Sequence, residues 1–144
     1  MGIRIYEATE FSDALAEAFA RLLPQLSEHL AVPDRKAAAR IVASAATRQL
    51  AAAAEEGRIV GLLSVALYDV PSGRKAWIED VVVDAAWRGR GVGEALVREA
   101  LALARREGVA RVMLTSNAAR EAAHRLYERI GFVRYETDCF RFDL

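Results

Sequence analysis

The spacing of apolar residues in the first third of the chain changes from alternation to a helical period. The opening residues alternate as a short strand would, and apolar positions then recur at helical spacing from a cap at or near Ser12 to about Leu30. Pro24 is expected to kink or divide this helix, because proline has no backbone N–H to donate. A second helix is predicted to start after Pro33-Asp34 and to end near Arg48. The two helices would form an N-terminal layer.

Alternation then returns in two neighbouring runs. Residues Gln49–Glu55 and Ile59–Tyr68 flank a turn at Glu56-Gly57, which is typical of two antiparallel strands. Alanine propensity alone would extend the preceding helix through Ala51–Ala54. The turn and the matching run after it favour the strand, so we predict a strand at these alanines.

A central strand and a helix are predicted around a glycine-rich turn. The run Trp77–Val83 is apolar and β-branched, as in a buried strand. Residues 91–107 carry apolar side chains at helical spacing, and Gly108 occupies the position of a left-handed cap. The strand, the turn and the helix are therefore contiguous.

The last quarter of the chain predicts one more strand, one more helix and an extended tail. We expect a strand over Val109–Ser116, a helix over Ala118–Ile130, and extended segments at Phe132–Tyr135 and Cys139–Phe142. No repeat, linker or low-complexity segment interrupts the pattern. Residues 1–144 are accordingly expected to form a single domain.

Composition narrows the function classes. With 144 residues, of which 53% are hydrophobic, the chain can bury about two-thirds of its unfolded surface in one core. Twenty basic and twenty acidic residues cancel, so nucleic acid and anionic membranes are not expected as partners. Cys139 cannot form an internal disulfide, and with only His29 and His124 no metal site is expected. No segment reaches about 18 uninterrupted apolar residues, so we expect a cytoplasmic protein.

The turn Arg88-Gly89-Arg90-Gly91-Val92-Gly93 carries the clearest chemical signal. A helix that begins directly after a strand leaves its first N–H groups unpaired, and the helix dipole adds partial positive charge. Glycines let a phosphate approach this backbone, and the two arginines add charge. The spacing is neither that of a P-loop nor that of a dinucleotide fingerprint. The alternative is a tight turn with solvated arginines.

The order of motifs around this turn resembles the GNAT superfamily of N-acetyltransferases. Arg-x-x-Gly-x-Gly after an apolar strand is similar to the family's acetyl-CoA loop, and Trp77–Asp84 is similar to its central strand. Ser116-Asn117, His124–Tyr127 and Gly131-Phe132 resemble its C-terminal motif. One departure is that Asp84–Trp87 stands where many relatives have a proline.

This resemblance implies an α/β GNAT fold with acetyl-CoA as the acyl donor. The fold would be a mixed, mostly antiparallel sheet of about six to seven strands with about four helices, splayed to admit the pantetheine arm as a pseudo-strand. The N–H of Val81 or Val83 would polarise the thioester carbonyl. The residues expected to bind the donor are Val81, Val82, Val83, Arg88, Gly89, Arg90, Gly91, Val92, Gly93 and Asn117.

Glu79 and Asp80 are the candidates for a general base. An alkylamine with a pKa near about 10.4 is almost entirely protonated at neutral pH, so a nearby proton acceptor is useful. Strand alternation would put Glu79 with Val81 and Val83 on one face and Asp80 with Val82 on the other. We favour Glu79, directly or through water. The alternative is one exposed carboxylate and one that forms a structural hydrogen bond.

Tyr127 is the candidate for a general acid. A phenol with a pKa near about 10 stays protonated at neutral pH and can donate a proton to a departing thiolate, which is the role of the family's tyrosine at this motif. An ordinary half-buried tyrosine is the alternative. Asn117 can cap the following helix as well as contact the donor. His124 is expected to be a structural helix-face residue.

The acceptor is expected to be a primary amine, mainly of a small molecule. The family usually selects its acceptor with the N-terminal helices, here Phe19 to Val42, which carry no recognisable signature. A protein or peptide amine would require an open groove, and a catalytically silent acyl-CoA-binding module is a third reading. The resemblance also allows a homodimer, for which the sequence indicates no interface.

Overall fold

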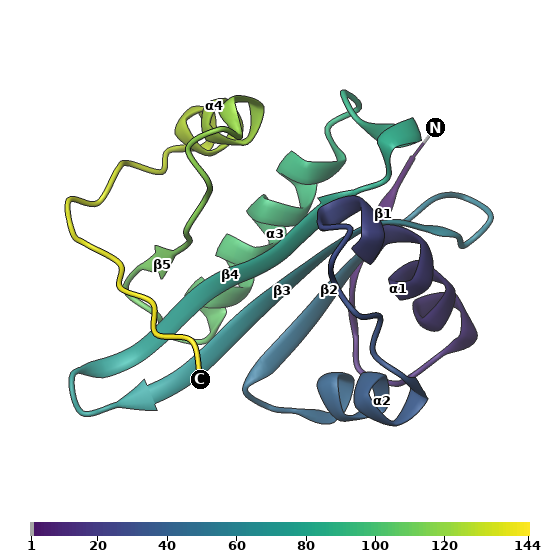
Figure 1. Ribbon diagram of the computed structural model, residues 1–144, viewed down its shortest axis with the longest axis horizontal. Coiled ribbons are helices and arrows are strands. Elements are labelled where there is room, and N and C mark those ends of the chain that lie inside the picture. The colour runs from purple at the N-terminus through teal and green to yellow at the C-terminus, as the bar shows by residue number, and fades with distance from the viewer. Residues whose placement is uncertain (1) are drawn as a thin grey trace. The chain divides into compact units, whose positions relative to one another are not determined.

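The computed structural model describes residues 2–144, and its main element is a five-stranded sheet (Figure 1). The strand order is β1-β2-β3-β4-β5; the first four strands are antiparallel to their neighbours, and β5 is parallel to β4. The strands are β1 (Arg4–Ala8), β2 (Thr47–Ala53), β3 (Ile59–Val70), β4 (Gly73–Val83) and β5 (Val112–Met113). The helices are α1 (Asp13–Leu26), α2 (Arg35–Ala43), the 3-10 turn η1 (Ala85–Trp87), α3 (Val92–Arg106) and α4 (Glu121–Ile130). This mixed, mostly antiparallel sheet confirms the predicted fold class.

The chain packs as two units, one that ends at Leu114 and one over Thr115–Leu144. The first unit holds the whole sheet with α1, α2 and α3, and the second holds α4 and the tail. One domain over residues 1–144 stays a prediction.

The N-terminal helices begin at side-chain caps. Ser12 Oγ accepts the Leu15 N–H at 3.1 Å, and Asp34 Oδ1 accepts the Ala37 N–H at 2.8 Å. Pro24 lies inside α1, which ends two residues later instead of near Leu30. The prediction that α2 extends to Arg48 is wrong, because Arg48 already belongs to β2.

The alanine run of β2 is a strand, as predicted. Ala51 pairs with Tyr6 of β1 and with Leu62 of β3, and it is fully buried. A central position needs small side chains where helices cover both faces of the sheet. Tertiary pairing therefore overrides the helical propensity of alanine.

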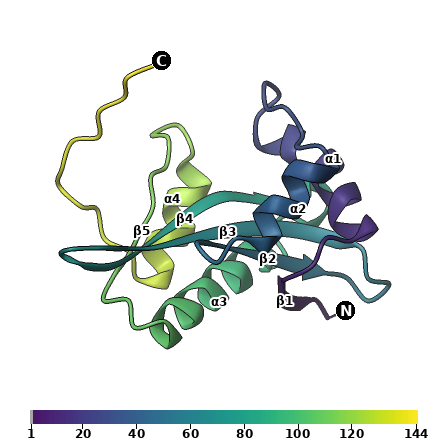
Figure 2. The same ribbon diagram turned by 90° about the horizontal axis from the view of Figure 1, so that it is seen from below.

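The two faces of the sheet are covered by different helices, as Figure 2 shows with α3 on one side and α1 and α2 on the other. Phe19 of α1, Leu62 of β3 and Val82 of β4 belong to one buried cluster. On the other face, a Cβ added to Gly61 would lie 2.9 Å from Val92 Cγ1 of α3. Gly61 therefore allows the start of α3 to pack closely on the sheet.

The strand count is five, below the predicted six to seven, because the expected extended segments of the tail are not strands. Residues 132–135 and 139–142 pair with no strand of the described chain, and Phe140 and Phe142 are 90% and 86% exposed. The strand expected over Val109–Ser116 is reduced to Val112–Met113. Apolar alternation favours an extended segment, but a strand also needs a partner ladder.

No helix within residues 2–144 is long and apolar enough to span a membrane.

An arginine joins α1 to the end of β4. Arg21 Nη1 donates to Asp84 Oδ2 at 2.7 Å and Nη2 donates to the Ile59 carbonyl at 2.5 Å. The side chains of Arg21 and Asp84 are only 19% and 16% exposed. Removal of one partner would leave the other charge poorly solvated.

We therefore expect Arg21→Ala to lower the free energy of unfolding by about 2–3 kcal/mol. The matched control is Arg98→Ala, which removes an exposed helical ion pair with Glu94 and should cost under about 0.5 kcal/mol. Urea unfolding followed by circular dichroism measures both. Equal losses in the two variants would contradict a stabilising role for the Arg21 contact.

Candidate functional site

A β-bulge interrupts β4 at the two candidate carboxylates. Ser64 pairs with Glu79 and Leu62 pairs with Val82, so β4 has one more residue than β3 between the two pairs. Asp80 has φ +50°, a left-handed conformation that is uncommon for a residue other than glycine.

The bulge makes the predicted parity wrong. Glu79 and Val82 pair with Ser64 and Leu62, which lie two apart on β3, so Glu79 shares its face with Val82 and not with Val81 and Val83. Both Glu79 and Asp80 border the same cavity. The sequence argument that only one carboxylate could reach each face assumed uninterrupted alternation.

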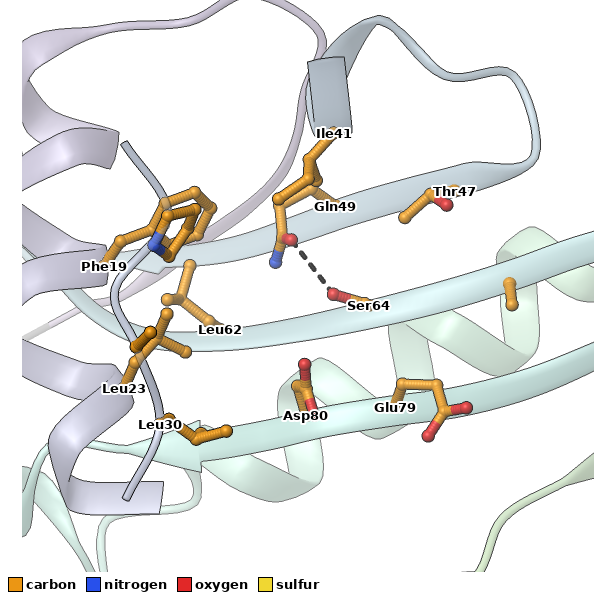
Figure 3. Close-up of a pocket in the computed structure, with 13 residues that line it drawn as sticks. Phe19, Leu23, Leu30, Ile41, Thr47, Gln49, Leu62, Ser64, Glu79 and Asp80 are labelled. Carbon is orange, nitrogen blue, oxygen red and sulfur yellow. Dashed lines mark hydrogen bonds between the residues drawn. The ribbon is translucent and has the colours of Figure 1, made fainter. Parts of the chain in front are cut away.

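This cavity has a volume of about 360 Å³ and lies on the α1 and α2 face of the sheet (Figure 3). Its walls combine an apolar body with a few polar groups, as in many small-molecule sites. The apolar lining residues are Phe19, Leu23, Leu30, Ala31, Pro33, Ile41, Leu62 and Ala66, and the polar ones are Thr47, Gln49, Ser64, Glu79 and Asp80.

Gln49 and Ser64 form a polar pair in the cavity wall that the sequence did not single out. Gln49 is buried, and its Nε2 donates to the carbonyls of Leu50 and Leu63 at 3.3 and 3.2 Å. Ser64 Oγ donates to Gln49 Oε1 at 3.0 Å, as drawn in Figure 3. A glutamine directly before the apolar run Leu50–Ala53 is the signal that could have indicated it.

Beyond the bulge, β4 is paired on one side only in the described chain. Its ladder with β5 has two residue pairs, Ala76 with Val112 and Trp77 with Met113. Val82 and Val83 pair with β3, and Val81–Val83 have no second strand on the other side in the described chain. This short ladder is the splay that the fold class implies, and it leaves a strand edge to which an extended ligand can add.

The glycine turn has the geometry of an anion site. Gly89 and Gly91 have φ +78° and +81°, which a side chain would strain. Gly91 caps α3 without a side-chain hydrogen bond, so the first-turn N–H groups of α3 are directed at the turn. Arg88 Nε donates to the Val83 carbonyl at 3.3 Å, and the Arg90 guanidinium lies 4.8 Å from the Trp87 ring centroid. These residues fit a phosphate or pyrophosphate.

In the second unit, Tyr127 is half-buried on α4. Its ring meets Phe132 edge-on, with 5.7 Å between centroids. Burial raises the pKa of Tyr127 above its ordinary value, and the charge of Arg120 offsets part of that rise. The phenol therefore keeps its proton at neutral pH.

Asn117 does not cap α4. Its Oδ1 accepts the Ala119 N–H at 2.9 Å in an Asx turn, and the residue at the N-cap is Arg120. The hydroxyl oxygen of the neighbouring Ser116 is buried and has no hydrogen-bond partner in the described chain. A buried hydroxyl without a partner is costly unless a group outside the described chain satisfies it.

The structure therefore brings together part of the predicted site. Glu79, Asp80, Val81–Val83 and the turn 88–93 follow one another along β4 and into α3, within the first unit. Tyr127 and Asn117 belong to the second unit, and their meeting with these residues stays a prediction. Within residues 2–144, no group of three or more His, Cys, Asp or Glu is placed to hold a metal ion.

A splayed sheet, a bulged central strand and a glycine turn at a helix start define the class of acyl-CoA-dependent N-acetyltransferases. Residues 10–132 match the model of the Acetyltransferase (GNAT) family, whose members use acetyl-CoA. The chain belongs to this family.

Relatives of known name agree with this assignment. The chain is 38% identical over 91 residues to a glucosamine 6-phosphate N-acetyltransferase of Trypanosoma brucei brucei. The matched region covers 61% of this chain and 59% of that protein. The chain thus spans about three-fifths of the length of that relative. The crystal structure of a Trypanosoma brucei acetyltransferase has a TM-score of 0.80 and 29% identity, over 99% of this chain and 100% of the other. An aminoglycoside acetyltransferase from an uncultured soil metagenomic sample, at TM-score 0.86 and 24% identity over 100% and 99%, shares the fold.

We expect Gly91→Ala to lower the free energy of unfolding by about 1–2 kcal/mol, because alanine is strained at φ +81° although nothing lies within 4 Å of the added Cβ. The same strain should distort the turn and weaken CoA binding in calorimetric titration. Gly2→Ala, at an open position without positive φ, is the control and should stay within about 0.5 kcal/mol of the parent. A Gly91→Ala variant as stable as the control would argue against the strained turn.

Proposed function

We propose that the protein transfers an acetyl group from acetyl-CoA to a primary amine of a small molecule, by direct attack in a ternary complex. The observation that carries this proposal is the order of three features along the chain. Two carboxylates at a bulge in β4 come first, the open edge at the end of β4 follows, and an anion-binding turn comes after the strand. These are the three parts that an aminolysis of a CoA thioester needs.

The donor would be held by backbone groups. The first-turn N–H groups of α3, with Arg88 and Arg90, would bind the pyrophosphate, and the open edge at Val81–Val83 would pair with the pantetheine arm. Asn117 would add a contact from the second unit. Acetyl-CoA supplies the activated acyl group; an N–H of Val81 or Val83 would stabilise the negative charge that develops on its carbonyl oxygen.

The carboxylates at the bulge would accept the proton of the ammonium. Glu79 lies on the cavity face of β4 and is the proposed base, directly or through water, with Asp80 beside it on the same cavity. The freed amine forms the new N–C bond as the C–S bond breaks.

Tyr127 would donate its phenolic proton to the departing thiolate. Burial keeps this phenol neutral at physiological pH, so that the proton is present when the thiolate forms. The nitrogen loses two protons in all. The ammonium proton passes to Glu79 and on to solvent; the second, lost as the amide forms, replaces through solvent the proton that Tyr127 gives to the thiolate, so one proton is released per turnover.

A small acceptor is favoured by the cavity itself. A volume of about 360 Å³ lies within the range of small-molecule sites, whereas a peptide acceptor needs an extended groove. The residues that close it come from α1, α2 and the segment between them, the region that the sequence assigned to acceptor choice.

We expect Glu79→Gln to lower kcat by about 10²–10⁴-fold and to change the pH–rate profile, because the amide cannot accept the proton. Asp80→Asn should have the smaller effect. Glu56→Gln, which removes one carboxylate in the exposed β2–β3 turn, is the control. Release of CoA thiol under saturating substrates is the measurement, and a parental profile in both Glu79→Gln and Asp80→Asn would refute the proposed base.

For Tyr127→Phe we expect unchanged acetyl-CoA affinity and a kcat lowered by about 10²–10⁴-fold. Because the pKa of Tyr127 is raised above about 10, its proton is retained through pH 9, and its loss should appear as an alkaline limb above about pH 10 in the parent only. Turnover of the variant at the parental rate, with saturating substrates, would remove Tyr127 from the mechanism.

A further inference from the structure

The charged side chains that line the cavity described above are all negative. Two of its lining residues, Glu79 and Asp80, carry carboxylates, and none of its lining residues is Lys, Arg or His. An anionic group inside this cavity would therefore meet like charges without a counter-ion, and a cationic group would meet two opposite charges.

The neutral polar groups add to this preference. Both Gln49 N–H donors face the carbonyls of Leu50 and Leu63, and the Ser64 proton faces Gln49 Oε1. The Gln49 and Ser64 donors are thus used within the wall, and these two side chains leave lone pairs for a ligand; the Thr47 hydroxyl can both donate and accept. The wall thus offers acceptors to hydrogen-bond donors such as ammonium groups.

Two arginines of the neighbouring elements, Arg21 and Arg48, are held by other partners. Arg21 of α1 bonds to Glu17, Asp84 and the Ile59 carbonyl. Arg48 pairs with Val65, which places it on the opposite face of the sheet from Ser64, and it bonds to Glu7. Neither guanidinium is available to neutralise the carboxylates.

We infer that the acceptor is a compact amine with a second cationic group on an apolar body, a diamine or polyamine, and that amines which carry a phosphate or carboxylate are rejected. The inference rests on the proposed function for the transfer step and on the cavity for selection. One carboxylate would take the proton of the reacting ammonium while the other holds the second ammonium. The apolar walls, such as Phe19, Leu23 and Leu62, would contact the methylene body.

A series of three short amines tests this selection. With saturating acetyl-CoA, thiol release is measured for 1,4-diaminobutane, n-butylamine and 4-aminobutanoate, whose ends remote from the reacting amine are an ammonium, a methyl group and a carboxylate. We expect kcat/KM to fall in that order, by about tenfold or more at each step, and to favour glucosamine over glucosamine 6-phosphate. An anionic amine that equals or exceeds its neutral or cationic analogue would overturn the inference while the transfer proposal stands.

Binding separates the two proposals. Calorimetric titration of the CoA-loaded protein should show the same order of affinity, and Asp80→Asn should reduce the preference of diaminobutane over butylamine by about tenfold, whereas the control Glu56→Gln should not. Selective diamine binding without turnover would support the inference and refute the transfer. Equal binding of the three amines, or binding of none, would overturn the inference.

Discussion

The site depends on one extra residue in β4. Asp80 adopts a left-handed conformation that costs about 1 kcal/mol, and the ladder with β3 holds it from both sides, through Glu79 and Ser64 before the bulge and Val82 and Leu62 after it. Without the bulge, strand alternation would separate the two carboxylates onto opposite faces. With it, both border one cavity, and Val82 still reaches the buried core. The strained backbone of Asp80 thus places two negative charges at the same cavity.

The segment after the bulge is fixed from both faces of the sheet. Arg21 joins α1 to Asp84 at the end of β4, and Gly61 lets α3 approach the sheet closely at its first turn. The open edge of Val81–Val83 therefore lies on a rigid support although no second strand pairs with it in the described chain. Rigidity matters here because a strand edge that is to hold a reacting thioester must keep its N–H groups in place as charge develops.

The sequence predicted what local chemistry determines. The glycine turn, the helix cap at Ser12, the helix start after Asp34 and the alanine strand follow from residue type and spacing, and the structure confirms them as elements. The bulge could not be predicted, since Asp80 carries no sign of it and register is decided by the partner strand. The same holds for the Gln49–Ser64 pair, which needs the register of β2 and β3 to form. The prediction of strands in the tail was wrong for a related reason, because an alternating pattern does not supply the neighbouring strand with which a segment must pair.

Although the formal net charge of the chain is zero, one segment of it carries a negative and a positive region. Toward its start, at residues 79–80, the segment presents carboxylates to a cavity without basic side chains; toward its end, at residues 88–93, it presents arginines and a helix N-terminus. A cationic amine would be attracted to the first and a pyrophosphate to the second, so each ligand would be disfavoured at the other's place. On the proposed mechanism, β4 and the turn that follows it would therefore sort a cationic acceptor from an anionic donor by charge before any specific contact forms, and the carbonyl to be attacked would lie between the two regions.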